Sequence, residues 1–200
     1  SVLAHGLIDA TEAPSVDAFE AAMASDAGQL ALKENVTILH CTSAYPTPLA
    51  DANVRAMTTM RETFNLNVGF SDHTEGQTAS LTATALGATV IEKHFTMDRS
   101  LPGPDHKASL TPEELTALIQ GVRGIESALG DGVKTPRPSE METISVARKS
   151  LIALYPIVKG AQLTAENVGA KRPGNGKSPM LFWDILDETA SNNFDEGEQI

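Results

Sequence analysis

The sequence of 200 residues is poor in cysteine, in aromatic side chains and in positive charge. Its one cysteine, Cys41, excludes a disulfide framework and favours a reducing, cytoplasmic location. A formal charge of −11 argues against a nucleic-acid partner, because neutralising phosphates needs clustered lysine and arginine. No apolar run approaches the roughly 20 residues of a membrane span, and no signal peptide is recognisable. We therefore expect neither a nucleic acid nor a membrane as partner.

Short apolar runs alternate with longer helical patterns through the first 130 residues. The runs predict strands over Ser1–His5, Thr37–Cys41, Asn67–Phe70 and Thr89–Glu92. The longer patterns predict helices over Val16–Lys33, Leu49–Phe64, Gln77–Leu86 and Pro112–Leu129. Such alternation is typical of an α/β fold with a parallel sheet. Four strand–helix units amount to half of an eight-stranded (β/α)8 TIM barrel. Because Ser1 stands inside a predicted strand, we expect a fragment or a processed product.

The composition changes after residue 130. Residues 131–144 are rich in glycine, proline and charge and are predicted to be a linker between a partial barrel (1–130) and a small, β-rich domain (145–200). In that domain Gly174–Ser178 superficially resembles a phosphate-binding loop. Lys171 stands where that motif requires a glycine, so we reject nucleotide binding there.

Two histidines, His73 and His94, each end a predicted strand and are 21 residues apart. Two parallel strands joined by one helix bring both imidazoles to the same edge of the sheet, where a divalent metal ion could bind. The alternative is that one or both are hydrogen-bonded core residues. For this pair the sequence leaves both interpretations open, whereas His5 and His40, inside predicted strands, are expected to be structural.

Side chains near these histidines are further candidates for the site. Alternation along a strand places Glu92 with His94 and Ser71 with His73, and it turns Lys93 to the opposite face. A carboxylate beside an imidazole can orient a metal ligand.

Two proline-containing loops carry the remaining candidates. Asp105 follows a Pro-Gly-Pro segment that could hold it over the barrel mouth, or the segment is a plain connector. Tyr45 precedes Pro46, and its loop could contact a sugar or a phosphate, or it is an ordinary surface loop.

Taken together, these strings resemble the sialic acid synthase family, which comprises the bacterial N-acetylneuraminate, legionaminate and pseudaminate synthases. The matching strings are Leu39–Pro46, Gly69–Gly76, Gly87–Thr96 and Gly103–Leu110, with Ala147–Ser150 and Lys171–Gly176 in the small domain. The resemblance runs from about residue 36 to the end. It implies that the chain holds barrel strands 5–8 followed by an antifreeze-like domain, assembled as a domain-swapped homodimer.

The resemblance also implies an activity, the condensation of phosphoenolpyruvate with an N-acylmannosamine-type amino sugar to a nine-carbon 2-keto acid and phosphate. A divalent ion, typically Mn2+ but alternatively Mg2+ or Co2+, would be held by His73 and His94. The match places Ser43 and Ser71 near the phosphate of phosphoenolpyruvate, Tyr45 and Asp105 on the sugar, Glu92 beside the metal, and Arg172 of a partner subunit on the acyl group.

Departures from the family pattern limit this reading. The first half-barrel of the family supplies lysines and a glutamate that this sequence does not contain, so the 200 residues alone are expected to be inactive. Ala4-His5-Gly6 replaces the usual Ser-Thr-Gly, and an atypical acidic insert follows near Asp9–Pro14. The alternative is a non-catalytic sugar-binding or dimerisation remnant. The Gly103–Ser109 string is closer to the neuraminate and legionaminate branch, and the sequence does not fix the sugar.

Overall fold

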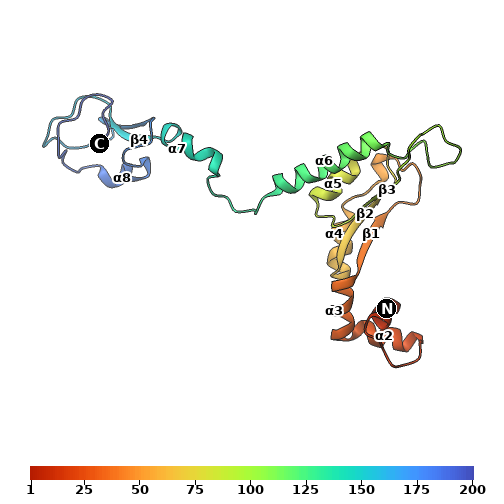
Figure 1. The fold of residues 1–200 in the computed structure, drawn as a ribbon. Helices are drawn as coiled ribbons and strands as arrows, with labels where there is room; N and C mark the ends of the chain where they lie inside the picture. Colours follow the sequence, from red (N-terminus) through yellow and green to blue (C-terminus); the bar gives the residue numbers. More distant parts are fainter. The chain divides into compact units, whose positions relative to one another are not determined.

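Three parallel strands form the centre of the first of two units, Ser1–Gly132, in the computed structural model, which describes residues 1–200 (Figure 1). The strands are β1 (Thr37–Cys41), β2 (Asn67–Asp72) and β3 (Ile91–Lys93), and they lie side by side in that order. All three were expected from the sequence. β2 ends two residues later than predicted, and β3 begins two residues later.

Helices follow the strands and return the chain to the start of the sheet. Helix α4 (Ala56–Phe64) joins β1 to β2, α5 (Thr78–Ala85) joins β2 to β3, and α6 (Pro112–Leu129) follows β3. The bounds of α6 match the prediction, because a capping box of Thr111 and Glu114 fixes its first turn. The predicted helix Leu49–Phe64 is instead a 3-10 turn, η1 (Leu49–Asp51), followed by α4.

The two faces of this sheet differ in what covers them. The face toward α4 and α5, called the helix face below, buries an apolar core of Ala52, Met57, Val68, Phe70, Ala79 and Ala83. The opposite face, called the open face below, carries the alternate residues Leu39, Cys41, Gly69, Ser71 and Glu92. Cys41 and Glu92 on the open face are exposed. A Cβ on Gly69 would stand 2.4 Å from Leu39 Cδ2, so a glycine is needed where these strands approach each other.

The first predicted strand, Ser1–His5, is wrong, because the chain forms helix α1 (Val2–Leu7) there. Ala4 of this helix is fully buried in a separate core with Ala22 and Leu32. A short apolar run fits a buried strand and a helix equally well, and tertiary packing decides between them. The sheet therefore has three strands where the half-barrel prediction required four.

The predicted helix Val16–Lys33 is divided into α2 (Val16–Ala24) and α3 (Asp26–Asn35). Ser25 separates them with an extended backbone, and its hydroxyl accepts the N–H of Gly28 at 3.0 Å. Serine favours such N-cap positions because its oxygen satisfies a free N–H of the first turn. One capping side chain thus interrupts an otherwise continuous helical pattern.

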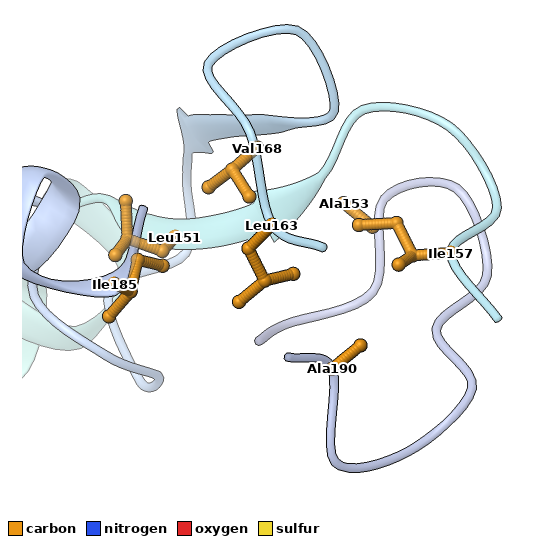
Figure 2. Packing of buried hydrophobic residues seen from close by; sticks show 7 residues of the cluster. All are labelled: Leu151, Ala153, Ile157, Leu163, Val168, Ile185 and Ala190. Carbon is orange, nitrogen blue, oxygen red and sulfur yellow. The ribbon is translucent and has the colours of Figure 1, made fainter. Parts of the chain in front are cut away.

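The second unit, Val133–Ile200, is built on two antiparallel strands, β4 (Ser150–Ala153) and β5 (Val168–Lys171). Isolated bridges such as Ile157 to Phe194 tie its loops together. Its core converges between β4 and these loops (Figure 2) and consists of Leu151, Ala153, Ile157, Leu163, Val168, Ile185 and Ala190. The unit begins at Val133, inside the predicted linker, and its regular strands are these two of four residues each.

Short helices flank this core. They are η2 (Pro138–Glu140), α7 (Met141–Ala147), η3 (Pro179–Leu181) and α8 (Phe182–Ile185). The predicted linker, 131–144, is therefore partly helical, because η2 and the start of α7 lie within it. Across the chain, none of the helices combines the length and the apolar character that crossing a membrane requires.

Candidate metal and substrate site

His73 and His94 lie directly after the last residues of β2 and β3, at the carboxyl edge of the sheet. Their ring centroids are 5.2 Å apart and the ring planes are 80° to each other. Both side chains are partly exposed. The structure thus brings together the two histidines that the sequence singled out, at the edge where parallel α/β folds bind ligands.

The imidazole of His73 is oriented by the backbone of the neighbouring strand. Its Nδ1 lies 2.8 Å from the carbonyl oxygen of Thr42, just after β1. Because a carbonyl only accepts, Nδ1 carries a proton in this contact, and in the neutral ring Nε2 is the nitrogen with the lone pair. A backbone carbonyl behind the ring is typical of metal-ligating histidines. The Sγ atom of Cys41 lies 3.8 Å from the same Nδ1, a neighbour that the sequence did not predict.

Tyr45 packs against both histidines. Its ring centroid is 4.3 Å from that of His94 and 5.1 Å from that of His73. Its hydroxyl donates to the carbonyl oxygen of Asp105 at 3.3 Å and lies 3.2 Å from the hydroxyl of Ser109. Tyr45 therefore links the loop after β1 to the loop after β3, with the two imidazoles beside it.

Asp105 reaches the histidine pair from the Pro-Gly-Pro loop. Its Oδ2 atom is 3.8 Å from Nδ1 of His94, and the two side chains are 56% and 37% exposed. An open cavity of about 410 Å³ lies beside them, lined also by Gly103 and His106. A Cβ on Gly103 would stand 3.1 Å from the His106 ring, so this glycine lets the loop fold closely. Asp105 can thus face a ligand in this cavity.

Ser71 and Glu92 lie on the open face as alternation predicts. The two are register partners, and the Ser71 hydroxyl donates to Glu92 Oε1 at 2.5 Å. Ser43 is exposed in the loop after β1. Seven of the eight predicted site residues therefore lie in the first unit. The eighth, Arg172, belongs to the second unit, where its Nε donates to the carbonyl oxygen of Ala147 at 2.8 Å.

His5 and His40, which the sequence predicted to be structural, both make structural contacts. Nε2 of His40 lies 3.0 Å from the carbonyl oxygen of Ala52, on the helix face. His5 is buried in α1 rather than in a strand, and its Nε2 lies 3.1 Å from the carbonyl oxygen of Glu12. Both rings bond to backbone carbonyls, that of His40 on the helix face and that of His5 in the N-terminal helical region.

A supporting chain of contacts that the sequence did not reveal holds the Asp105 loop. Arg99 pairs with Glu114 at 2.6 Å and donates through Nε to the carbonyl oxygen of Ser109 at 3.0 Å. The Ser109 hydroxyl in turn donates to the carbonyl oxygen of Asp105 at 2.7 Å. The backbone N–H of Thr111, followed by Arg99, lowers the pKa of Glu114. The sequence predicted helix α6 itself but not its connection to this loop.

The sequence also missed a buried ion pair directly behind the site. Lys93 Nζ lies 3.0 Å from Asp72 Oδ2, and the side chains are 4% and 0% exposed. Each residue immediately precedes one of the two histidines. The alternation that predicted the opposite orientation of Lys93 could have suggested this pair once the β2–β3 register was known.

The donors at the carboxyl edge suit a divalent metal ion, although they are few. Neutral imidazoles suit transition-metal ions such as zinc, copper, iron and nickel, and carboxylates suit manganese and magnesium. No group of three or more histidine, cysteine, aspartate or glutamate side chains in the structure is arranged to hold a metal ion. Two protein ligands would leave the other coordination positions to water or substrate.

A parallel α/β sheet with paired imidazoles and hydroxyls at its carboxyl edge defines a class of ligand-binding α/β proteins. Within that class, the chain belongs to the NeuB family, whose pattern matches residues 6–134. The resemblance to sialic acid synthases is therefore confirmed.

Several curated relatives are similar to the chain. An N,N'-diacetyllegionaminic acid synthase of Campylobacter jejuni is 48% identical over 170 residues, which are 85% of this chain and 51% of that protein. A synthase of the same name from Legionella pneumophila is 44% identical, over 83% of this chain and 47% of that protein. An N-acetylneuraminate-9-phosphate synthase of Homo sapiens is 40% identical over 70% and 39%, respectively. The chain spans about half the length of the two legionaminic acid synthases.

Two solved structures are also similar. An N-acetylneuraminic acid synthetase from Leptospira borgpetersenii, in complex with citrate, is 34% identical with a TM-score of 0.54, over 72% of this chain and 52% of that chain. A candidate spore coat polysaccharide biosynthesis protein E from Chromobacterium violaceum is 23% identical with a TM-score of 0.65, over 93% and 56%. At that identity the second likeness shows the fold alone, which is a mixed α/β fold.

Proposed function

We propose that this chain carries the metal-binding and sugar-facing part of an enzyme that condenses phosphoenolpyruvate with an N-acylmannosamine-type sugar. The observation that carries the proposal is the meeting of His73 and His94, 5.2 Å apart at the carboxyl edge, with the ring of Tyr45 against both. The names of the relatives, which are legionaminic, pseudaminic and N-acetylneuraminate-9-phosphate synthases, support this reaction class.

The fold that accompanies this function would be a (β/α)8 barrel followed by an antifreeze-like domain. The open face of the sheet supports the proposal, because parallel sheets in α/β proteins are normally covered on both faces. In a barrel the same face of the sheet lines the interior, and the active site lies at the carboxyl ends of the strands. As in the family, the working enzyme would be a domain-swapped homodimer. The exposed thiol of Cys41 supports a reducing, cytoplasmic location.

The reaction joins C3 of phosphoenolpyruvate to the aldehyde carbon of the open-chain sugar. Water then adds at C2, and the tetrahedral product loses phosphate as the C2–O bond breaks, which leaves the 2-keto acid. A divalent ion on His73 and His94, typically Mn2+ with Mg2+ or Co2+ as alternatives, would supply Lewis-acid polarisation of the aldehyde oxygen. The hydrogen bond from Nδ1 of His73 to the carbonyl of Thr42 leaves Nε2 free to bind the metal ion.

Substrate contacts would come from the two loops beside the histidines. Tyr45 and Asp105 are joined through the Asp105 carbonyl, and both would contact the sugar. Asp105 supports this role because it is more than half exposed beside a cavity. Arg172 of the partner subunit would contact the acyl group.

The hydroxyls near β1 and β2 would receive the phosphate of phosphoenolpyruvate. Ser71 and Ser43 are the residues involved, and Ser71 is already fixed by its 2.5 Å hydrogen bond to Glu92. Glu92 would lie beside the metal. Its carboxylate accepts the hydrogen bond from the Ser71 hydroxyl, and this contact orients the hydroxyl.

Within the family, we favour the legionaminate branch, in which the sugar is a diacetylated 6-deoxy relative of N-acetylmannosamine. The legionaminic acid synthases are 48% and 44% identical to the chain, whereas pseudaminic acid synthases of Campylobacter jejuni and Helicobacter pylori are 40% and 36% identical. Side-by-side assays with both sugars test this preference.

Mn2+ binding tests the site directly. Electron paramagnetic resonance titration of the chain should show one Mn2+ site that is lost in the double variant His73→Ala, His94→Ala. The loss should exceed the roughly 10–100-fold that changes behind a metal ligand cause. His5→Gln is the matched control, since His5 bonds to Glu12 in the helical region and should leave binding unchanged. Mn2+ binding that survives the double variant contradicts the metal assignment.

Phosphate release tests the reaction. The longest protein that the gene encodes should release phosphate from phosphoenolpyruvate only when Mn2+ and an N-acylmannosamine-type sugar are present. Release that is indifferent to the sugar would sink the condensation, and sugar binding without release would favour a non-catalytic sugar-binding protein instead.

A further inference from the structure

The buried ion pair of Asp72 and Lys93 crosses from β2 to β3 on the helix face. The two residues are register partners, and Nζ of Lys93 is 3.0 Å from Oδ2 of Asp72. Their side chains are 0% and 4% exposed, so water hydrates neither charged group to any extent. The pair is separated from the candidate site only by the thickness of the sheet.

The contacts of this pair fasten the chain on both sides of His73. The Asp72 carboxylate accepts the N–H of Thr74 at 2.8 Å and the hydroxyl of Ser80 at 2.5 Å, besides the lysine. Lys93 also donates to the carbonyl oxygen of Thr74. His73 therefore stands between two residues that are bound to the same ammonium group, and His94 directly follows the lysine that carries it.

Stability alone does not account for a pair in this place. Taking two charges out of water offsets most of their attraction, and a well-packed apolar replacement is often as stable or more stable. What the pair does fix is the register of β2 against β3. A slip of one residue would turn Lys93 to the open face and Glu92 to the helix face, and it would move the two histidines relative to each other.

We propose that Asp72 and Lys93 are positioning residues, which hold His73 and His94 in the mutual arrangement that binds the metal ion. Neither residue contacts the site, and their effect passes through the backbone on either side of the imidazoles. This inference rests on the proposed metal-binding function of the two histidines.

The test replaces the pair without leaving a charge unpaired. In Asp72→Asn, Lys93→Met the chain should fold with an unchanged circular dichroism spectrum, because both new side chains are neutral and similar in length. Nuclear Overhauser contacts among the rings of Tyr45, His73 and His94, measured without metal, should weaken or disappear. Mn2+ affinity by electron paramagnetic resonance should fall by about 10-fold or more, as for other changes behind metal ligands.

The matched control is the exposed pair Arg123–Glu126 on α6, whose side chains are 72% and 50% exposed. Arg123→Met, Glu126→Gln should leave the ring contacts and the Mn2+ affinity unchanged. A folded Asp72→Asn, Lys93→Met chain with the ring contacts of the original chain overturns the positioning role, whatever the metal does. Loss of Mn2+ binding in His73→Ala, His94→Ala but not in this variant overturns it as well.

A failure of the proposed function has a different signature. If the unmodified chain binds no Mn2+ through its histidines, the metal assignment fails, while the ring contacts still decide whether the pair positions the imidazoles. If Asp72→Asn, Lys93→Met does not fold, Ser80→Ala serves instead, since it removes one hydroxyl from Asp72 and no charge. Weakened ring contacts in Ser80→Ala support the inference, and unchanged contacts overturn it.

Discussion

At the ends of β2 and β3, the polar groups of the two sides of the sheet differ in their burial and in their contacts. On the helix face Asp72 and Lys93 are buried, and every contact is made within the protein. At the carboxyl edge beside the open face, His94 and the loop residue Asp105 remain partly exposed next to a cavity, with Asp105 Oδ2 3.8 Å from His94 Nδ1. Buried polar groups whose hydrogen bonds are all made within the protein typically have structural roles. Exposed polar groups with free hydrogen-bonding or metal-binding atoms can bind ligands.

This division arises within single tripeptides. Ser71-Asp72-His73 and Glu92-Lys93-His94 each pass from the open face to the helix face and back. Proximity to a histidine in the sequence therefore does not identify a site residue. The strand period does, because it sends every second side chain to the opposite face.

The largest loss of stability should come from breaking the buried ion pair on the helix face. Lys93→Ala leaves the Asp72 carboxylate buried without its cation, which typically lowers the free energy of unfolding by about 3–5 kcal/mol. Glu92→Gln, at the neighbouring position on the open face, is the matched control and should cost less than about 1 kcal/mol. Urea unfolding of both variants measures the difference, and equal losses would mean that the two faces do not differ as described.

A smaller effect should follow from loosening the open face. Ser71→Ala removes a 2.5 Å hydrogen bond to the Glu92 carboxylate and should lower the free energy of unfolding by about 1.5 kcal/mol. The hydroxyl of Ser71 is buried, but water can still reach its exposed partner. Ser43→Ala, an exposed loop change, should alter stability by less than about 0.5 kcal/mol. If Ser71→Ala lost as much stability as Lys93→Ala, polar contacts on the open face would be as important for stability as the buried ion pair on the helix face.

The sequence predicted the parts of the fold that local rules determine. The strand period and the position of the histidines after β2 and β3 brought His73 and His94 to one edge. The predicted bounds of α6, Pro112–Leu129, match the structure, where a capping box of Thr111 and Glu114 begins the helix. A site residue was therefore predictable where the end of its own strand was enough to place its side chain.

Features that depend on distant neighbours were missed or wrong. Val2–Leu7 is a helix because Ala4 packs on α2 and α3, and no local signal separates that run from a strand. The Asp72–Lys93 pair requires the β2–β3 register, which a single sequence does not supply. Arg99 likewise meets Glu114 and Ser109 only after the loop has folded.

The smallest expected effect concerns the loop that carries Asp105 beside the histidines. Glu114 accepts the Thr111 N–H and pairs with Arg99, and these contacts lower the pKa of Glu114 from its ordinary value of 4.5. A carboxyl with a lowered pKa in the folded state stabilises the protein above its unfolded pKa and loses that contribution as the pH falls through the folded pKa. The contribution of Glu114 should therefore be complete above pH 4.5 and fade below it.

Glu114→Gln measures this contribution. Above pH 4.5 the variant should unfold at a lower urea concentration than the original chain, and the gap should narrow as the pH falls further. Glu126→Gln, which breaks only the exposed pair with Arg123, separates loss of a surface charge from loss of the loop contact. A gap that stays constant with pH would show that the capping hydrogen bond acts without the charge. In that case Arg99 holds the Asp105 loop through Ser109 alone, and the open face depends on helix α6 less than its contacts suggest.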